Sequence, residues 1–187
     1  DGMPGGGLDE ERSQMAALAR GDRQAMAWLI QRYGPGLRRF LAGVLTDANE
    51  AEDVAQDTFL RVWRAAARYD PGRASPATWI YRIGLRQAID RNRRRGFRRF
   101  LGLDAAPDPV DDAPGAEADL ASRQVLALTR AALASLPDRQ RKALLLRAVA
   151  GMTNGDIAAV LGISPGAVEQ LLVRARAGLR ATMGDLR

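Results

Sequence analysis

Residues 153–180 read TNGDIAAVLGISPGAVEQLLVRARAGLR, which predicts two short helices joined by a tight turn. Thr153 begins a Thr-x-x-Asp capping box, a pattern typical of helix starts. Gly162 supplies the left-handed residue that commonly ends a helix, because glycine adopts this conformation at little cost. Ser164 can cap the next helix, and Pro165 suits its first position, where no backbone donor is needed.

The second of these helices has two contrasting faces. Apolar residues recur at spacings of three and four, as on a packed face: Val168, Leu171, Leu172, Ala175 and Leu179. The opposite face is small and polar and is flanked by arginines: Gly166, Glu169, Gln170, Val173, Arg176 and Ala177. Such a face suits a helix that lies in the DNA major groove, so the segment is interpreted as a helix-turn-helix. An ordinary helical hairpin is the alternative.

Composition narrows the possible functions. The 187 residues carry a net charge of +6, from 28 Lys+Arg against 22 Asp+Glu, and most of the positive charge is arginine, which favours phosphate and base-edge contacts. Cysteine and histidine are absent, which excludes disulfides, thiolate zinc sites, thiol nucleophiles and histidine acid–base catalysis. We therefore expect no catalytic residue, no metal and no cofactor. No apolar run approaches the roughly 18–20 residues that span a bilayer, so we expect no membrane insertion and a cytoplasmic location.

A second amphipathic helix is predicted over residues 50–68. One face is small and apolar, which suits a core. On the other face Leu60 is surrounded by charged and amide groups, as an anchor for a partner helix would be. A solitary exposed leucine without a partner has the same pattern. The polar groups of this face are Asp53, Gln56, Asp57, Arg61 and Arg64.

A third helix is predicted over residues 78–95, after a loop rich in proline and glycine at residues 69–76. Its apolar residues point in several directions, so we expect neighbours on more than one side. An aromatic start beside a cationic end suits a nucleic-acid track, in which phosphates meet arginine and bases stack on rings. A solvated charged face is the alternative. The cationic residues are Arg82, Arg86, Arg91, Arg93, Arg94, Arg95, Arg98 and Arg99.

The remaining segments set the domain organisation. Residues 101–119 hold six acidic residues, three prolines and no basic residue, so they cannot form a core and predict an extended linker. The sequence Gly34-Pro35-Gly36 predicts a helix stop, and Asp138 is expected to cap a helix. The sequence therefore predicts an all-α chain of two small helical domains, residues 8–99 and 120–183, joined by an acidic flexible linker, residues 100–119.

Four segments together resemble the bacterial sigma factors of the extracytoplasmic-function group of the sigma-70 family. They occur in the order and spacing of that family, and they span most of the chain outside its first residues and linker. The segments are AEDVAQDTFLRVW at 51–63, PATWIYRIGLRQAIDRNRRR at 76–95, LPDRQRKALLLRAVAGMTNGDIAAVLG at 136–162 and SPGAVEQLLVRARAGLR at 164–180. The resemblance implies an alternative sigma factor that binds core RNA polymerase, directs initiation at promoter DNA and is held inactive by an anti-sigma factor.

The resemblance also implies roles for matching positions. The surface that binds core polymerase would contain Asp53, Gln56, Asp57, Leu60 and Arg64. The surface that binds and melts the minus-10 element would contain Arg73, Ser75, Trp79, Tyr81, Arg82, Arg86, Gln87, Arg91, Arg93 and Arg94. The surface that binds the minus-35 element would contain Ser164, Pro165, Gly166, Glu169, Gln170, Val173, Arg174 and Arg176.

Three positions depart from the family pattern. Arg86 stands where many relatives carry asparagine, and Gln170-Leu171 stands where many carry Ser-Arg. Leu171 belongs to the packed face by its spacing, so base reading is expected to shift to its exposed neighbours. The promoter sequence of relatives therefore does not carry over to this chain.

Two other functions fit parts of the sequence. A stand-alone helix-turn-helix regulator would form homodimers on a palindromic site. A nucleic-acid enzyme such as a recombinase would need a catalytic cluster, and Asp53 and Asp57 share a face without a third carboxylate.

Overall fold

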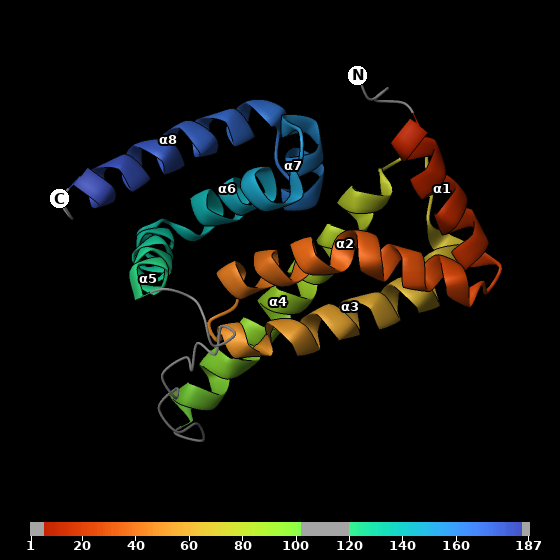
Figure 1. Ribbon diagram of the computed structural model, residues 1–187, viewed down its shortest axis with the longest axis horizontal. Helices are drawn as coiled ribbons and strands as arrows, with labels where there is room; N and C mark the ends of the chain where they lie inside the picture. The colour runs from red at the N-terminus through yellow and green to blue at the C-terminus, as the bar shows by residue number, and fades with distance from the viewer. Residues whose placement is uncertain (1–5, 102–119, 185–187) are drawn as a thin grey trace.

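The structure is a computed structural model that describes the backbone of residues 6–101 and 120–184 and the side chains of residues 7–101 and 128–182 (Figure 1). Over these residues the chain is helical, with no strand. The first group of helices is α1 (Gly6–Ala19), α2 (Arg23–Val44), α3 (Ala51–Ala65) and α4 (Pro76–Phe100), with 3₁₀ turns η1 (Ala48–Glu50) and η2 (Ala66–Arg68) flanking α3. The second group is α5 (Leu120–Ser135), α6 (Asp138–Ala150), α7 (Asn154–Leu161) and α8 (Pro165–Gly184). The predicted linker lies almost entirely outside the described residues.

The predicted helix stop at Gly34-Pro35-Gly36 is wrong, because α2 runs through it without a break. A proline inside a helix costs roughly 3 kcal/mol, and burial on both sides of it offsets that cost here. Leu29 lies in the core before Pro35, and Leu37 lies in the core after it. Gly36 also lets α4 approach, since a Cβ there would lie 2.6 Å from the Tyr81 hydroxyl.

The cap predicted at Asp138 is also wrong. Pro137 occupies the cap position, and Asp138 is the first residue of α6. Its carboxylate binds the following turn instead, 3.3 Å from Arg141 and 2.5 Å from Lys142. An acidic residue in the first turn still interacts favourably with the helix dipole, so the helix start is stabilised without the cap.

The helix predicted over residues 78–95 is enclosed on several sides, as expected. It forms the central part of α4, which begins at Pro76 and packs against α2, α3 and α7. Ile80 and Ala88 are fully buried in these contacts.

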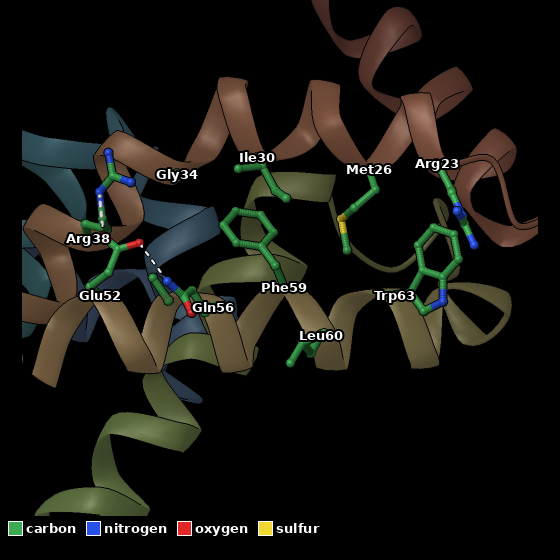
Figure 2. Close-up of a pocket in the computed structure, with 11 residues that line it drawn as sticks. Arg23, Met26, Ile30, Gly34, Arg38, Glu52, Gln56, Phe59, Leu60 and Trp63 are labelled. Atoms are coloured by element: carbon green, nitrogen blue, oxygen red, sulfur yellow. Dashed lines mark hydrogen bonds and ion pairs between the residues drawn. The ribbon is translucent and has the colours of Figure 1, made fainter.

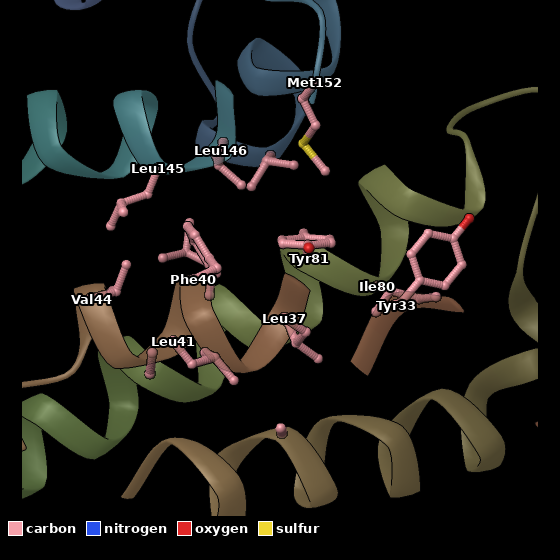
Figure 3. Close-up of a cluster of buried hydrophobic side chains, with 14 of the residues drawn as sticks. Tyr33, Leu37, Phe40, Leu41, Val44, Ile80, Tyr81, Leu145, Leu146 and Met152 are labelled. Carbon is pink, nitrogen blue, oxygen red and sulfur yellow. The ribbon is translucent and has the colours of Figure 1, made fainter. Parts of the chain in front are cut away.

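The two groups of helices pack against each other and share one apolar core (Figure 1). The main contact joins α2 to α6, and a second one joins α4 to α7. Figure 3 shows Leu145, Leu146 and Met152 of the second group facing Phe40 and Tyr81 of the first group. Gly43 permits the close approach of α6, because a Cβ there would lie 2.6 Å from a Leu145 methyl group. The two groups of helices therefore form one continuous apolar core.

Candidate DNA-binding and polymerase-binding surfaces

The helix-turn-helix forms as its sequence predicts. The Thr153 hydroxyl accepts from the Asp156 backbone N–H at 3.2 Å, and an Asp156 carboxylate oxygen accepts from the Thr153 N–H at 3.2 Å. Gly162 ends α7 with φ 67°. Ser164 caps α8 by accepting from the Ala167 N–H at 3.2 Å. These local bonds fix the angle at which α8 leaves the turn, so they orient its free face.

The free face of α8 carries the residues predicted to read DNA. Val168, Leu172 and Ala175 are buried against the rest of the second group. The predicted minus-35 residues are all exposed, and they comprise Ser164, Pro165, Gly166, Glu169, Gln170, Val173, Arg174 and Arg176. Val173 is 54% exposed, so this apolar side chain is free to contact another molecule.

The loop before α4 is held by a series of short contacts. The Arg73 N–H donates to the Asp70 carbonyl at 3.1 Å, and the Arg73 guanidinium pairs with the Asp70 carboxylate at 3.2 Å. The Tyr69 hydroxyl donates to the Ala74 carbonyl at 2.9 Å. Ser75 caps α4 by accepting from the Thr78 N–H at 3.1 Å. Arg73 is exposed and Ser75 is half-buried, so the loop presents both at the surface.

Two predicted minus-10 residues lie inside the protein. Tyr81 is 3% exposed and packs edge-on against Phe40, and burial raises the pKa of its hydroxyl to about 12. Gln87 is buried and donates from its amide to the Thr58 hydroxyl at 3.0 Å, which joins α4 to α3. Both residues support the fold in this arrangement, and Gln87 reaches only the lining of a small pocket between α3 and α4. Trp79 and Arg82 are half-buried and reach the surface in part.

The arginines of α4 differ in whether they have acidic partners. Arg91 pairs with Glu50 at 3.2 Å, and Arg93 pairs with Asp90 at 3.2 Å. Arg95, which belongs to the predicted cationic track but not to the minus-10 residues that the resemblance implies, binds Asp47 at 2.9 Å. The second half of α4 is therefore partly neutralised by the chain itself.

A second set of arginines lines a pocket beside α4. Only Arg86 belongs to that helix, whereas Arg61 and Arg64 lie on α3 and Arg68 lies in η2. A pocket of about 550 Å³ between α3, η2 and α4 is lined by Arg61, Arg64, Arg68 and Arg86 around Ala65 and Ile83. Over the residues that the structure describes, none of these four arginines lies within ion-pair distance of a carboxylate. Four unpaired cations around one pocket repel each other, so the pocket is suited to an anion such as phosphate. Arg94 is also exposed and lies beside Arg61 and Asp57.

The predicted polymerase-binding residues lie on two sides of α3. Gln56 and Leu60 line a groove of about 610 Å³ between α2 and α3 (Figure 2). Leu60 is 52% exposed, and Phe59 and Trp63 line the groove beside it. Asp57 and Arg64 face the α4 side instead, and Asp53 is exposed.

The sequence did not predict that residues of α2 line one side of this groove. Figure 2 shows Met26 and Ile30 of α2 pointing toward Phe59 of α3. Ile30 is 42% exposed, an unusual state for a residue within an apolar stripe. The sequence gives no signal for this exposure, because the stripe of α2 reads the same whether a neighbour covers it or not.

In the described ranges, no single helix is long and apolar enough to cross a bilayer, and α7 with α8 pass that test only as a pair bent by 100°. No group of acidic residues within the described part of the chain is arranged to hold a metal ion.

An exposed helix-turn-helix face together with an arginine-lined helical surface defines a helical DNA-binding protein. The model of Sigma-70 region 2 matches residues 29–98, and the model of Sigma-70 region 4 matches residues 126–179. Relatives at 35–36% identity cover more than nine tenths of the chain, so it belongs to the extracytoplasmic-function group of the sigma-70 family and is an alternative RNA polymerase sigma factor.

Similar proteins cover nearly the whole chain. It is 36% identical to RNA polymerase sigma factor CnrH of Cupriavidus metallidurans, over 94% of this chain and 95% of that one. It is 35% identical to the ECF RNA polymerase sigma factor RpoE of Cereibacter sphaeroides, over 92% and 97%. A solved complex of the sigma factor RpoE with the anti-sigma factor NepR from Bartonella quintana matches with a TM-score of 0.72 and 25% identity, over 86% of this chain and 98% of that one.

Proposed function

We propose that this sigma factor binds core RNA polymerase through the α2–α3 groove and promoter DNA through two further surfaces. Residues 8–99 would form the domain that binds polymerase and the minus-10 element, and residues 120–183 the domain that reads the minus-35 element. The observation that supports the proposal is that an apolar surface and a cationic surface lie on different sides of α3. One exposed groove is apolar, whereas the pocket across α3 from it is lined by unpaired arginines.

The groove suits a helical partner. Leu60 is exposed and lines the groove together with Phe59 and Trp63. Its side chain can therefore insert between side chains of a docking helix. Glu52 and Gln56 form a polar border of the groove on the same helix, which can fix the orientation of the partner, and Asp53 is exposed next to them in sequence. The large clamp helices of core polymerase are the partner that the family resemblance implies.

The minus-10 surface combines the loop before α4 with the arginine pocket. The loop presents Arg73 and Ser75, and Trp79 lies next to it at the start of α4. A base flipped out of the duplex can be bound there by stacking and by hydrogen bonds to its edge. Phosphates of the same strand would enter the pocket lined by Arg64 and Arg86. We therefore assign Arg64 to DNA in place of the polymerase contact expected from sequence, and add Arg61 and Arg68.

The minus-35 surface is the exposed face of α8, whose side chains suit major-groove contacts. Glu169 can accept a hydrogen bond from a cytosine amino group, and Gln170 can bind adenine at two atoms. Val173 can contact a thymine methyl group. Arg174 and Arg176 lie on the same helix at positions that suit phosphate or guanine.

Regulation by an anti-sigma factor follows from the relatives. The RpoE of Bartonella quintana was solved in complex with the anti-sigma factor NepR. An anti-sigma factor of this chain would cover the α2–α3 groove and the exposed face of α8, which would block polymerase and DNA together. The chain itself would perform no chemistry, since polymerase makes the RNA and the sigma factor supplies binding energy.

The proposal is tested by binding and footprinting with purified core polymerase. The chain should bind core polymerase tightly and free DNA weakly, and the complex should make minus-10 thymines reactive to permanganate. Tight binding of the free chain to a palindromic DNA site, without affinity for core polymerase, would contradict the proposal and favour the stand-alone regulator.

A further inference from the structure

The loop between η2 and α4 has two halves that are held by different contacts. In the first half, Asp70 organises a turn: its carboxylate accepts from the Gly72 N–H at 2.9 Å, and its carbonyl accepts from the Arg73 N–H at 3.1 Å. These bonds lie within residues 70–73 and do not reach Ala74. The first half is thus fixed locally.

The second half is tied back to the loop's beginning by a single side chain. The Tyr69 hydroxyl donates to the Ala74 carbonyl at 2.9 Å and so bridges the two ends of the loop. The Tyr69 ring packs against Trp79, with 5.3 Å between ring centroids and 55° between ring planes. Burial raises the pKa of Tyr69, so the hydroxyl remains a donor at neutral pH.

We infer that Tyr69 is a positioning residue for minus-10 recognition, and that its hydroxyl holds the second half of the loop at Ala74 against the first half, in the shape that receives the flipped base. The inference rests on the proposed function and adds a residue to it. Loop ordering opposes binding, so a loop already fixed in its bound shape binds with less loss of conformational freedom. Phenylalanine would fill the same space and keep the contact with Trp79. The substitution therefore removes the hydrogen bond to Ala74 and leaves the packing of the ring in place.

The test compares Tyr69→Phe with the wild-type chain, each bound to core polymerase on one promoter that the wild type opens. Two quantities are measured: the affinity of the closed complex, by competition with heparin, and the rate of strand opening, by permanganate reactivity over time. Tyr69→Phe should slow strand opening by about five- to tenfold. The affinity of the closed complex should change by less than about twofold. The thermal midpoint of the free chain should change by less than about 2 °C, because a lost neutral hydrogen bond contributes little to overall stability.

The matched control is Tyr33→Phe. Tyr33 is a buried tyrosine of the same helical group, on α2 and outside both the loop and the groove. Its loss of a hydroxyl should leave strand opening unchanged, which separates the bridge to Ala74 from a general effect of removing a tyrosine hydroxyl.

Three results would overturn the inference, and they differ from each other. An unchanged opening rate for Tyr69→Phe would overturn it alone. Equal losses in closed-complex affinity, opening rate and thermal midpoint would assign Tyr69 a purely structural role. A wild-type chain that opens no promoter would overturn the proposed function and this inference with it.

Discussion

The Thr78 hydroxyl at the start of α4 donates a 3.0 Å hydrogen bond to a carboxylate oxygen of Asp156 in α7. The other oxygen of that carboxylate accepts from the Thr153 hydroxyl at 2.6 Å, as part of the cap of α7. One side chain therefore shapes the helix-turn-helix and joins it to the helix proposed to bind the minus-10 element. The two surfaces proposed to bind DNA are therefore held in a single closed body.

The closed body must open for promoter binding. The minus-35 and minus-10 elements are separated by roughly 25 base pairs, or about 85 Å of B-form DNA at 3.4 Å per base pair. The proposed minus-35 helix α8 packs on α7, and α7 contacts α4, so α8 and α4 cannot lie on both elements at once in this arrangement. Since the chain has no cysteine, Thr78→Cys with Asp156→Cys introduces one pair of thiols. Oxidation of this pair should abolish transcription initiation, and reduction should restore it.

The reduced double variant is the control for the disulfide, because it carries the same two substitutions without the covalent bond. Disulfide formation is checked by gel mobility without reductant. An oxidised chain that initiates as well as its reduced form would show that the closed arrangement is compatible with promoter binding.

Leu60→Ala should weaken binding to core polymerase by about tenfold or more, as for a central apolar anchor. The side chain is 52% exposed, so its truncation should leave the free energy of unfolding nearly unchanged. Ile89→Ala is the matched control, since Ile89 is 44% exposed on α4 and lies outside the groove. Affinity is measured by fluorescence anisotropy with labelled chain, and equal affinities for the two variants would remove the groove from the interface.

Arg176→Ala should weaken binding to minus-35 duplex DNA and flatten its salt dependence. A lost phosphate contact lowers the slope of log affinity against log salt by about 1. Arg139→Ala is the control, because Arg139 is exposed on α6 and was assigned to no DNA surface. The slope is obtained from titrations at several salt concentrations, and an unchanged slope for Arg176→Ala would place this residue outside the interface.

Gly162→Ala should destabilise the chain by roughly 1–2 kcal/mol, the cost of placing an L-residue in the left-handed region. Gly162 has φ 67° at the end of α7. Gly155→Ala, inside the same helix, should be neutral or stabilising by up to about 1 kcal/mol, because a Cβ there would meet only the Thr153 hydroxyl at 3.7 Å. Urea unfolding measures both, and a stabilising Gly162→Ala would contradict the role of this glycine.

Local signals predicted most of the helical elements. The cap at Thr153, the left-handed Gly162 and the exposed Leu60 follow from neighbours in sequence, which determine backbone geometry and the face on which a residue lies. The stop predicted at Pro35 failed because burial along α2 outweighs the cost of one proline, and burial depends on elements distant in sequence. A local sequence pattern therefore cannot show whether burial or the cost of the proline is the larger effect.

The DNA-binding residues show the same limit. Periodicity placed Gln87 on α4, but its burial depends on Thr58 of α3. The charge of α4 was evident from sequence, whereas the pairing of Arg91 with Glu50 depends on tertiary packing. The packing of α6 on α2 was equally hidden, because an apolar stripe does not identify the helix that covers it.

The most direct test of the account is transcription in vitro by core polymerase, with and without this chain, from a pool of genomic promoter fragments. The account predicts new transcripts that require the chain and that start at a small set of fragments sharing minus-35 and minus-10 elements. The same transcripts with and without the chain, or none with it, would contradict the account.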